Sequence, residues 1–298
     1  METAPADSLA VVIDGYSFLE DPRWRDGALY VSDFFTRQVL RVRDGAHERV
    51  CEIEQQPSGL GWDPDGNLLV VSMLDRCLLR FDGERVTRVA DLSAWATGPC
   101  NDMLVDPRGR AYVGNMGGDG EADSQLVETV LVRVDPDGSA RPVADGLRFP
   151  NGLALTPDGR TLLLAETYGA RISAFDVADD GSLANRRTWA DFATDGLRET
   201  AREMVATGAI LPDGIALDAE GALWVADAAG KGAFRVREGG ELLERVDTGA
   251  LTAFSVALGG ADGRTLFVCA SPTLFETDYP HDHRSCVLAR TVRVPAAG

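Results

Sequence analysis

The chain has 298 residues, of which 45% are apolar, and its 47 acidic and 29 basic residues give a formal net charge of −18. This length can be accommodated in one closed all-β architecture with a sizeable core. No apolar run reaches the ~18 residues of a membrane-spanning helix. A surface this acidic repels nucleic acid and anionic membranes and attracts cations, so neither nucleic acid nor a membrane is an expected partner.

The first residues and the cysteines indicate the compartment. The start, METAPADSLA, lacks the basic and apolar regions of a signal peptide. The five cysteines form no CxxC pair, and an odd number of isolated cysteines is typical of a reducing compartment rather than of a disulfide framework or a zinc site. We therefore expect a cytoplasmic protein, either a monomer or a small homo-oligomer.

After a lone apolar stretch, SLAVVID (8–14), one pattern recurs along the whole chain. Each copy has an apolar run, a turn centred on Asp-Gly or a relative, and a strand that ends in a small or polar residue. In chain order the copies are DPRWRDGALYVSD (21–33), LGWDPDGNLLVVS (60–72), MLVDPRGRAYVGN (103–115), LALTPDGRTLLLAET (153–167), IALDAEGALWVAD (215–227) and VALGGADGRTLFVCAS (256–271). Their turn glycines lie 39, 43, 50, 62 and 42 residues apart.

Each hairpin is followed by a third strand, such as QVLRVR (38–43), and usually by a fourth. Four strands per unit at this spacing are typical of a propeller blade. We therefore predict an all-β fold, a six-bladed β-propeller that forms a single domain over residues 1–298. The last unit lacks a fourth strand, so residues 8–14 are expected to close the ring beside 286–293 and to remove an exposed edge. An open β-sandwich fits the regular four-strand units less well.

The longest spacing comes from an insertion, TDGLRETAREMVATGA (194–209). Leu197, Ala201 and Met204 recur at helical spacing, and Thr194 or Asp195 can cap a helix. We expect a short helix that lies over the pocket as a lid. A helix packed on the edge of the disc, without a role in binding, is the alternative.

Polar side chains stand just before the innermost strands, which all start on one face of a propeller. They are Glu20, Ser58, Asn101, Asn151, Asp213 and Ser255. All are hard oxygen donors, which suit Ca²⁺, Mg²⁺ or Mn²⁺ better than Zn²⁺. A divalent cation would also offset the repulsion between two neighbouring carboxylates. The alternative is that each Asn or Asp only forms a side-chain turn before its strand.

The loops after the second strands fall on the same face. Phe34, Met73, Met116 and Tyr168 are candidates for an apolar pocket wall, although ordinary loop packing explains them equally well. An acidic loop (119–123) is expected to be solvated rather than to bind a second cation. His281 and His283 form an HxH pair, which we interpret as part of a polar loop. One of the two is a candidate proton shuttle at the pocket mouth.

Four motifs together resemble the gluconolactonase, regucalcin and senescence-marker-protein family of six-bladed propellers and, more distantly, diisopropyl-fluorophosphatase. They are EDPRW (20–24), CNDMLVDPRGRAYVGN (100–115), PNGLALTPDG (150–159) and PDGIALDAEGALWVAD (212–227). The resemblance implies one catalytic divalent metal. The residues that match its ligands are Glu20, Asn151 and Asp213, with Asn101 on or near the metal.

The resemblance also implies hydrolysis of lactones, often sugar lactones, with Asp213 as base or nucleophile. One departure concerns the substrate. Sugar lactonases of the family usually carry Arg two residues before the position of Asn101, and here that residue is Pro99. Because this departure removes the Arg, we expect a substrate less polar than a sugar lactone.

The predicted function is metal-dependent lactone hydrolysis by a carbonyl polarised at the metal, with Asp213 and Asn101 as catalytic residues. Ca²⁺ is expected in the first place, with Mg²⁺, Mn²⁺ or Zn²⁺ as alternatives. Ser58, Met73, Met116, Tyr168, Ser255 and His281 are the candidate pocket residues. A phosphotriesterase-type hydrolase and a non-catalytic calcium-binding propeller are the alternative functions.

Overall fold

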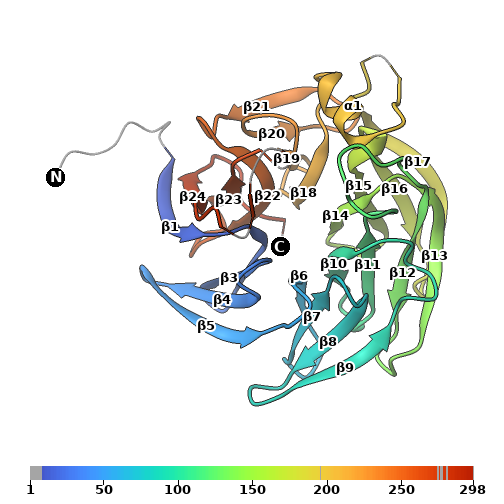
Figure 1. The fold of residues 1–298 in the computed structure, drawn as a ribbon, viewed down its shortest axis with the longest axis vertical. Helices are drawn as coiled ribbons and strands as arrows, with labels where there is room; N and C mark the ends of the chain where they lie inside the picture. The colour runs from blue at the N-terminus through green and yellow to red at the C-terminus, as the bar shows by residue number, and fades with distance from the viewer. Residues whose placement is uncertain (1–8, 195, 274, 276–277, 280, 298) are drawn as a thin grey trace.

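Six four-stranded antiparallel sheets are arranged around a central axis in the computed structural model, which describes residues 9–194, 196–273, 275, 278–279 and 281–297 (Figure 1). This confirms the predicted six-bladed β-propeller. Among the described residues, no helix combines the length and the apolar character needed to cross a membrane.

The strands follow one another blade by blade, from the channel outwards. They are β2 (Leu19–Arg25), β3 (Ala28–Asp33), β4 (Gln38–Arg43) and β5 (Ala46–Glu52) in blade 1; β6 (Pro57–Trp62), β7 (Leu68–Ser72), β8 (Cys77–Phe81) and β9 (Val86–Asp91) in blade 2; β10 (Cys100–Val105), β11 (Ala111–Asn115), β12 (Thr129–Val134) and β13 (Ala140–Leu147) in blade 3; β14 (Pro150–Leu155), β15 (Thr161–Glu166), β16 (Arg171–Val177) and β17 (Leu183–Asp191) in blade 4; β18 (Pro212–Leu217), β19 (Leu223–Asp227), β20 (Ala233–Val236) and β21 (Leu242–Val246) in blade 5; and β22 (Thr252–Gly259), β23 (Thr265–Ser271) and β24 (Ser285–Thr291) in blade 6.

The N-terminal strand β1 (Ala10–Tyr16) closes the ring, as predicted. It pairs antiparallel with β24, with Ala10 opposite Ala289, so that blade 6 has the order β1-β24-β23-β22 (Figure 1). The first and last parts of the chain thus share one sheet, and the outer edge of β24 is paired rather than exposed.

Burial within a blade explains the sequence pattern of its strands. Middle strands such as β7 and β19 are buried at every residue, because the two neighbouring blades cover both of their faces. The outer strand β5 is mostly exposed and carries charged residues. The glycine of each hairpin turn has φ between +70° and +87°, a conformation that residues with a Cβ rarely adopt. The repeat therefore combines apolar middle strands with turns that need glycine.

A second set of glycines lies inside the inner strands and allows close approach around the channel. A Cβ on Gly152 of β14 would lie 2.5 Å from the backbone oxygen of Asp213. A Cβ on Gly59 of β6 would lie 2.5 Å from the backbone nitrogen of Met103. The small residue that follows Asn151 in the sequence is therefore needed to bring β14 against β18.

Replacing Gly152 by Ala is expected to lower the free energy of unfolding by about 1–3 kcal/mol. The added methyl group would overlap with backbone atoms of β18, which cannot move aside as a flexible side chain could. It should also lower activity, since it separates Asn151 from Asp213. Chemical denaturation and a lactone assay would measure the two effects. The control is Gly159→Ala, at a turn where a Cβ meets nothing within 4 Å but φ is +70°. That variant should be destabilised by about 1–2 kcal/mol with no change in activity.

The insertion of blade 5 contains the helix α1 (Ala201–Ala206), which is shorter than the predicted 194–209. Thr200 caps it, not Thr194, while Asp195 lies outside the described residues. The Thr200 hydroxyl accepts a hydrogen bond from the Glu203 N–H, and the Glu203 carboxylate accepts one from the Thr200 N–H. This capping box satisfies two helix-end donors, which explains why the helix begins there. Leu197 is 40% exposed and does not share the buried face of Ala201 and Met204.

Candidate active site

The inner strands lose their regular pairing where the predicted polar residues lie. In β10 the regular register is interrupted between Cys100 and Met103, and in β14 between Pro150 and Leu153. In β18 the interruption falls between Pro212 and Ile215. Bulges of this kind re-aim side chains next to active sites. Asn101, Asn151 and Asp213 therefore lie outside the regular strand pairing, at the end of the channel.

A cavity of about 580 Å³ opens over this end of the channel. Glu20, Asn101, Asn151 and Asp213, from four different blades, lie together in its lining, although up to 193 residues separate them in sequence (Glu20 to Asp213). Each is at most 6% exposed. We call these four residues the floor of the cavity. Their roles as metal ligands and catalytic groups stay predictions.

A chain of hydrogen bonds fixes the two floor amides. The Ser58 hydroxyl donates to Asn101 Oδ1 (3.1 Å), and Asn101 Nδ2 donates to Asn151 Oδ1 (3.1 Å). Asn151 Nδ2 donates to the Thr167 hydroxyl (3.0 Å), which in turn donates to the Pro212 carbonyl (2.8 Å). Each amide oxygen accepts one hydrogen bond here and has a second lone pair for another partner.

The floor carries buried negative charge. Burial, followed by the charges of Asp213 and Asp102, raises the pKa of Glu20 well above its usual value. Burial and the charge of Asp102 likewise raise the pKa of Asp213, and a hydrogen bond with Asn151 opposes this. Both carboxylates would be easier to keep ionised if a cation lay between them.

The carboxylates of Asp21 and Asp102 and the guanidinium group of Arg23 also lie close to the floor. Burial raises the pKa of Asp102 to about 6, against the lowering effect of Arg23. Arg23 forms an ion pair with the buried Asp21 (2.5 Å) and donates to the carbonyl of Met103 (2.8 Å). The predicted site residues did not include Asp21, Arg23, Asp102 or Thr167. The signal was present, because Asp21 and Asp102 each directly follow a floor residue, in ED and ND.

The donor set suits a hard divalent cation. Two carboxylates and two amides supply only oxygen ligands, which Ca²⁺ and Mg²⁺ prefer. Asp102 Oδ1, beside the floor, is buried without a hydrogen-bond partner. Within the described part of the chain, no group of three or more His, Cys, Asp or Glu side chains is placed to hold a metal, and the floor itself has only two such side chains. The residues present therefore fit a cation held by mixed carboxylate and amide oxygens.

The remaining predicted pocket residues lie in different places. Met73, Met116 and Tyr168 line the cavity. Ser58 is buried, donates a hydrogen bond to Asn101 and is not among the described lining residues, so its prediction as a pocket residue is wrong. The Ser255 hydroxyl faces β18, 2.1 Å from where a Cβ on Gly214 would lie, and Phe254 lines the cavity in its place.

The loops at the mouth differ in their relation to the cavity. The His281 side chain is 79% exposed, lies 3.4 Å from Asp278 and is not among the lining residues. His283 is also exposed. In the acidic loop, Asp119 and Glu121 are exposed residues at the rim, and Asp123 forms an ion pair with Arg202 (2.7 Å). The structure thus places the acidic loop at the cavity mouth and the histidines outside the lining.

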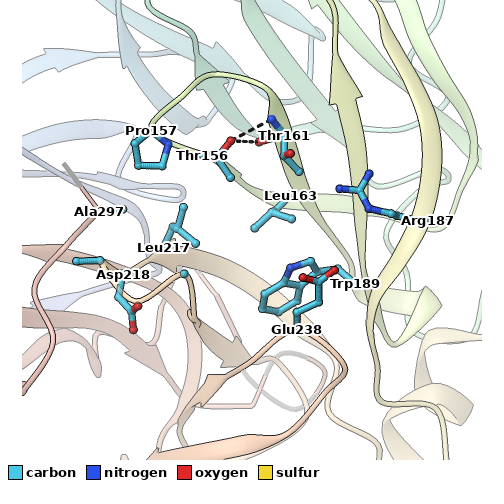
Figure 2. A pocket seen from close by; sticks show the side chains of 12 residues that line it. Thr156, Pro157, Thr161, Leu163, Arg187, Trp189, Leu217, Asp218, Glu238 and Ala297 are labelled. Atoms are coloured by element: carbon cyan, nitrogen blue, oxygen red, sulfur yellow. Dashed lines mark hydrogen bonds between the residues drawn. The ribbon is translucent and has the colours of Figure 1, made fainter.

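A second cavity, of about 440 Å³, lies at the other end of blades 4 and 5, beside their hairpin turns (Figure 2). Leu163, Trp189 and Leu217 line it together with the charged Arg187 and Glu238. None of the predicted site residues is in its lining. The candidate chemistry therefore belongs to the cavity above the floor.

Comparison with known proteins places the chain in a family. Residues 19–271 match the family described as SMP-30/Gluconolactonase/LRE-like region. The chain belongs to this family. It is 26% identical to a 6-deoxy-6-sulfogluconolactonase of Pseudomonas putida, over 93% of this chain and 91% of that protein.

Two solved structures have the same fold. A gluconolactonase from Xanthomonas campestris is 26% identical, with a TM-score of 0.72 over 97% of this chain and 89% of that one. A regucalcin from Agrobacterium tumefaciens, described as a calcium-binding protein, is 18% identical, with a TM-score of 0.76 over 98% and 97%. The family of this chain thus includes lactone hydrolases.

Proposed function

We propose that this protein hydrolyses lactones with the help of one divalent cation, Ca²⁺ in the first place. The observation that carries the proposal is the convergence of Glu20, Asn101, Asn151 and Asp213 on the floor of one cavity. The lactonase names of relatives that match almost the whole chain support the reaction type. The calcium-binding relative supports the choice of cation.

Glu20, Asn151 and Asp213 would hold the cation, with Asn101 on it or beside it. A bound divalent cation supplies Lewis-acid polarisation of an ester carbonyl and lowers the pKa of a bound water. Asp213 accepts a proton from the water that attacks the carbonyl carbon, the ring C–O bond breaks, and the departing ring oxygen takes up a proton as the hydroxyl of the product. In the alternative, the Asp213 carboxylate attacks the carbonyl carbon, the ring C–O bond breaks, and water then hydrolyses the acyl-enzyme. Asn101 and Asn151 orient the ester, because their amides are fixed by the hydrogen bonds from Ser58 to Thr167.

Tyr168 borders the same site. Burial and the charge of Asp213 raise the pKa of its hydroxyl, so it stays neutral. Its ring packs against Phe149 with a centroid distance of 5.4 Å and is only 7% exposed. We assign it a role in excluding bulk water from Asp213, which strengthens electrostatic interactions on the floor.

We also propose that α1 forms a lid together with the loop between β11 and β12 of blade 3. Val205 and Ala206 line the cavity, and Arg202 pairs with Asp123 of that loop. The backbone adds a bridge between Gln125 and Thr200, so the two segments cover the floor as one unit. A lid of this kind excludes water once substrate is bound.

The test is a panel of γ- and δ-lactones assayed beside a paraoxon-type phosphotriester, with and without EDTA. We expect lactone turnover that is lost with EDTA and returns with Ca²⁺. Turnover of the phosphotriester alone would favour the phosphotriesterase alternative. Tight Ca²⁺ binding without any turnover would favour a non-catalytic calcium-binding propeller.

A further inference from the structure

Aromatic side chains form one side of the cavity. We call Phe18, Phe34, Phe35 and Phe254, all of which line it, the aromatic wall. The ring of Phe18 lies 5.0 Å from that of Phe34 and 4.8 Å from that of Phe254. Met73, which is 3% exposed, packs against the same cluster. The wall is thus an apolar surface contributed by blades 1 and 6, and blade 2 supports it through Met73.

The opposite side of the cavity is also apolar. Phe149 and Tyr168 pack together there with Leu211, and Val205 of the proposed lid belongs to the same cluster. Met116 contacts both this cluster and the aromatic wall. A molecule standing on the floor therefore lies between two apolar surfaces.

Among the described lining residues, few polar groups above the floor could serve a substrate with many hydroxyls. Above the floor, the described lining residues with neutral polar side chains are Gln56, Thr167, Tyr168, Thr252 and Thr273. The Thr167 hydroxyl is already used by Asn151 and Pro212. Burying hydroxyl groups against aromatic rings without hydrogen-bond partners is costly. The lining is thus poorly suited to a polyol.

The charges of the lining are also unsuited to an anionic substrate. Glu20 and Asp213 on the floor and Asp119 and Glu121 at the rim are acidic. Among the described lining residues the one cation is Arg202, whose guanidinium makes two hydrogen bonds to the carboxylate of Asp123. A negatively charged substituent would face repulsion without a free cationic partner.

We propose that the substrate is a neutral lactone with an apolar alkyl or aryl substituent. The lactone ring lies on the floor, and the substituent packs against the aromatic wall. The assignment rests on the proposed lactonase function for its reaction, and on the lining alone for the substituent.

The test compares kcat/KM for four probes on the Ca²⁺-loaded full-length protein: γ-butyrolactone, γ-decalactone, glucono-δ-lactone and 6-phosphogluconolactone. We expect kcat/KM to rise by up to about fourfold for each methylene that the wall buries. γ-Decalactone should be the best substrate and the phosphorylated lactone the poorest. A kcat/KM for glucono-δ-lactone equal to or above that for γ-decalactone overturns the proposal.

Two matched variants locate the effect. Phe34→Leu should lower the ratio of kcat/KM for γ-decalactone over γ-butyrolactone by about fivefold, since part of the wall is lost. The control is Phe175→Leu, which makes the same substitution at a buried residue of blade 4 that does not line the cavity. In this variant the ratio of the two kcat/KM values should stay unchanged. The ratio is internal to each variant, so a change in the amount of folded protein does not alter it. A ratio that falls equally in both variants, or in neither, contradicts the assignment.

A binding measurement separates this inference from the proposed reaction. Calorimetry with 5-hexyl-2-pyrrolidinone and 2-pyrrolidinone, lactams that resist hydrolysis, should show tighter binding of the hexyl compound. If it does and no lactone is turned over, the lactonase function fails while the apolar substituent site stands. If lactones are turned over without any dependence on chain length in either assay, the function stands and this inference fails.

Discussion

Replacing Asp213 by Asn is expected to lower kcat/KM for lactone hydrolysis by about 10²–10⁴-fold, the usual contribution of a general base. Asn has nearly the same shape and keeps an oxygen that can face a cation, but it cannot take a proton or attack a carbonyl. The fold should persist, because the change also removes one of the buried charges whose ionisation is unfavourable. Initial rates with γ-decalactone and a Ca²⁺ titration would separate loss of the base from loss of the cation.

The matched control is Asp65→Asn, at an exposed position in the hairpin turn of blade 2. It makes the same chemical change far from the cavity and should leave kcat/KM and Ca²⁺ affinity as they are. If Asp213→Asn folds, binds Ca²⁺ and hydrolyses lactones at the wild-type rate, then the proposed role of Asp213 is wrong.

The fold could be predicted because the sequence repeats one four-strand pattern along the chain. Six hairpins with a turn glycine at similar spacing leave few architectures, and the spare strand at residues 8–14 had one unpaired partner, β24. Propeller topology then turns the starts of the inner strands into one ring. This is why Glu20, Asn101, Asn151 and Asp213 could be grouped from sequence alone.

Ser255 is a ring position whose predicted place in the pocket lining is wrong. In β10, β14 and β18 the interrupted register leaves two residues between paired positions, and the first of them is the floor residue. In β22 the interruption leaves only one residue, Phe254, between paired positions. Ser255 then pairs regularly opposite Cys269. The type of bulge depends on how the neighbouring strands pack, which the local sequence does not encode. The aromatic side chain therefore lines the cavity instead of the hydroxyl.

The insertion before β18 carried a signal for the start of its helix that was outweighed. Leu197 fits the helical spacing, which extended the predicted helix towards Thr194. Thr200 and Glu203 form a Thr-x-x-Glu capping box, which places the helix start six residues later. Asp21, Arg23 and Asp102 were missed for a different reason. The sequence places Asp21 and Asp102 directly after Glu20 and Asn101, but their burial and the pairing of Asp21 with Arg23 follow from packing between neighbouring blades.

The same buried carboxylates predict how stability depends on pH and on the cation. In the unfolded chain Glu20 and Asp213 titrate near 4. In the folded protein without a cation, burial and mutual repulsion raise both pKa values. Below pH ~4 both states are protonated and these two groups contribute no penalty. As the pH rises, the unfolded chain loses its protons first, so the free energy of unfolding falls until the pH passes the raised pKa values.

Ca²⁺ is expected to reverse this effect, since it binds the ionised carboxylates of the folded state. At about 100 times its dissociation constant a ligand stabilises the folded state by about 2.7 kcal/mol. For a chain of this size that is a rise in Tm of about 5 °C. The rise should be larger near pH 8 than near pH 5, because the competing protons are absent at the higher pH. Thermal unfolding in EDTA and in excess Ca²⁺ at the two pH values measures it.

The double variant Glu20→Gln, Asp213→Asn isolates the contribution of the floor from that of the many other carboxylates. In EDTA near pH 8 it should be more stable than the wild type, because two buried charges are replaced by neutral groups of similar shape. Near pH 4 the advantage should shrink, and added Ca²⁺ should no longer raise its Tm. If Ca²⁺ still raises the Tm of the double variant, the cation binds elsewhere. If the double variant is less stable than the wild type in EDTA at both pH values, the floor carboxylates serve the fold instead.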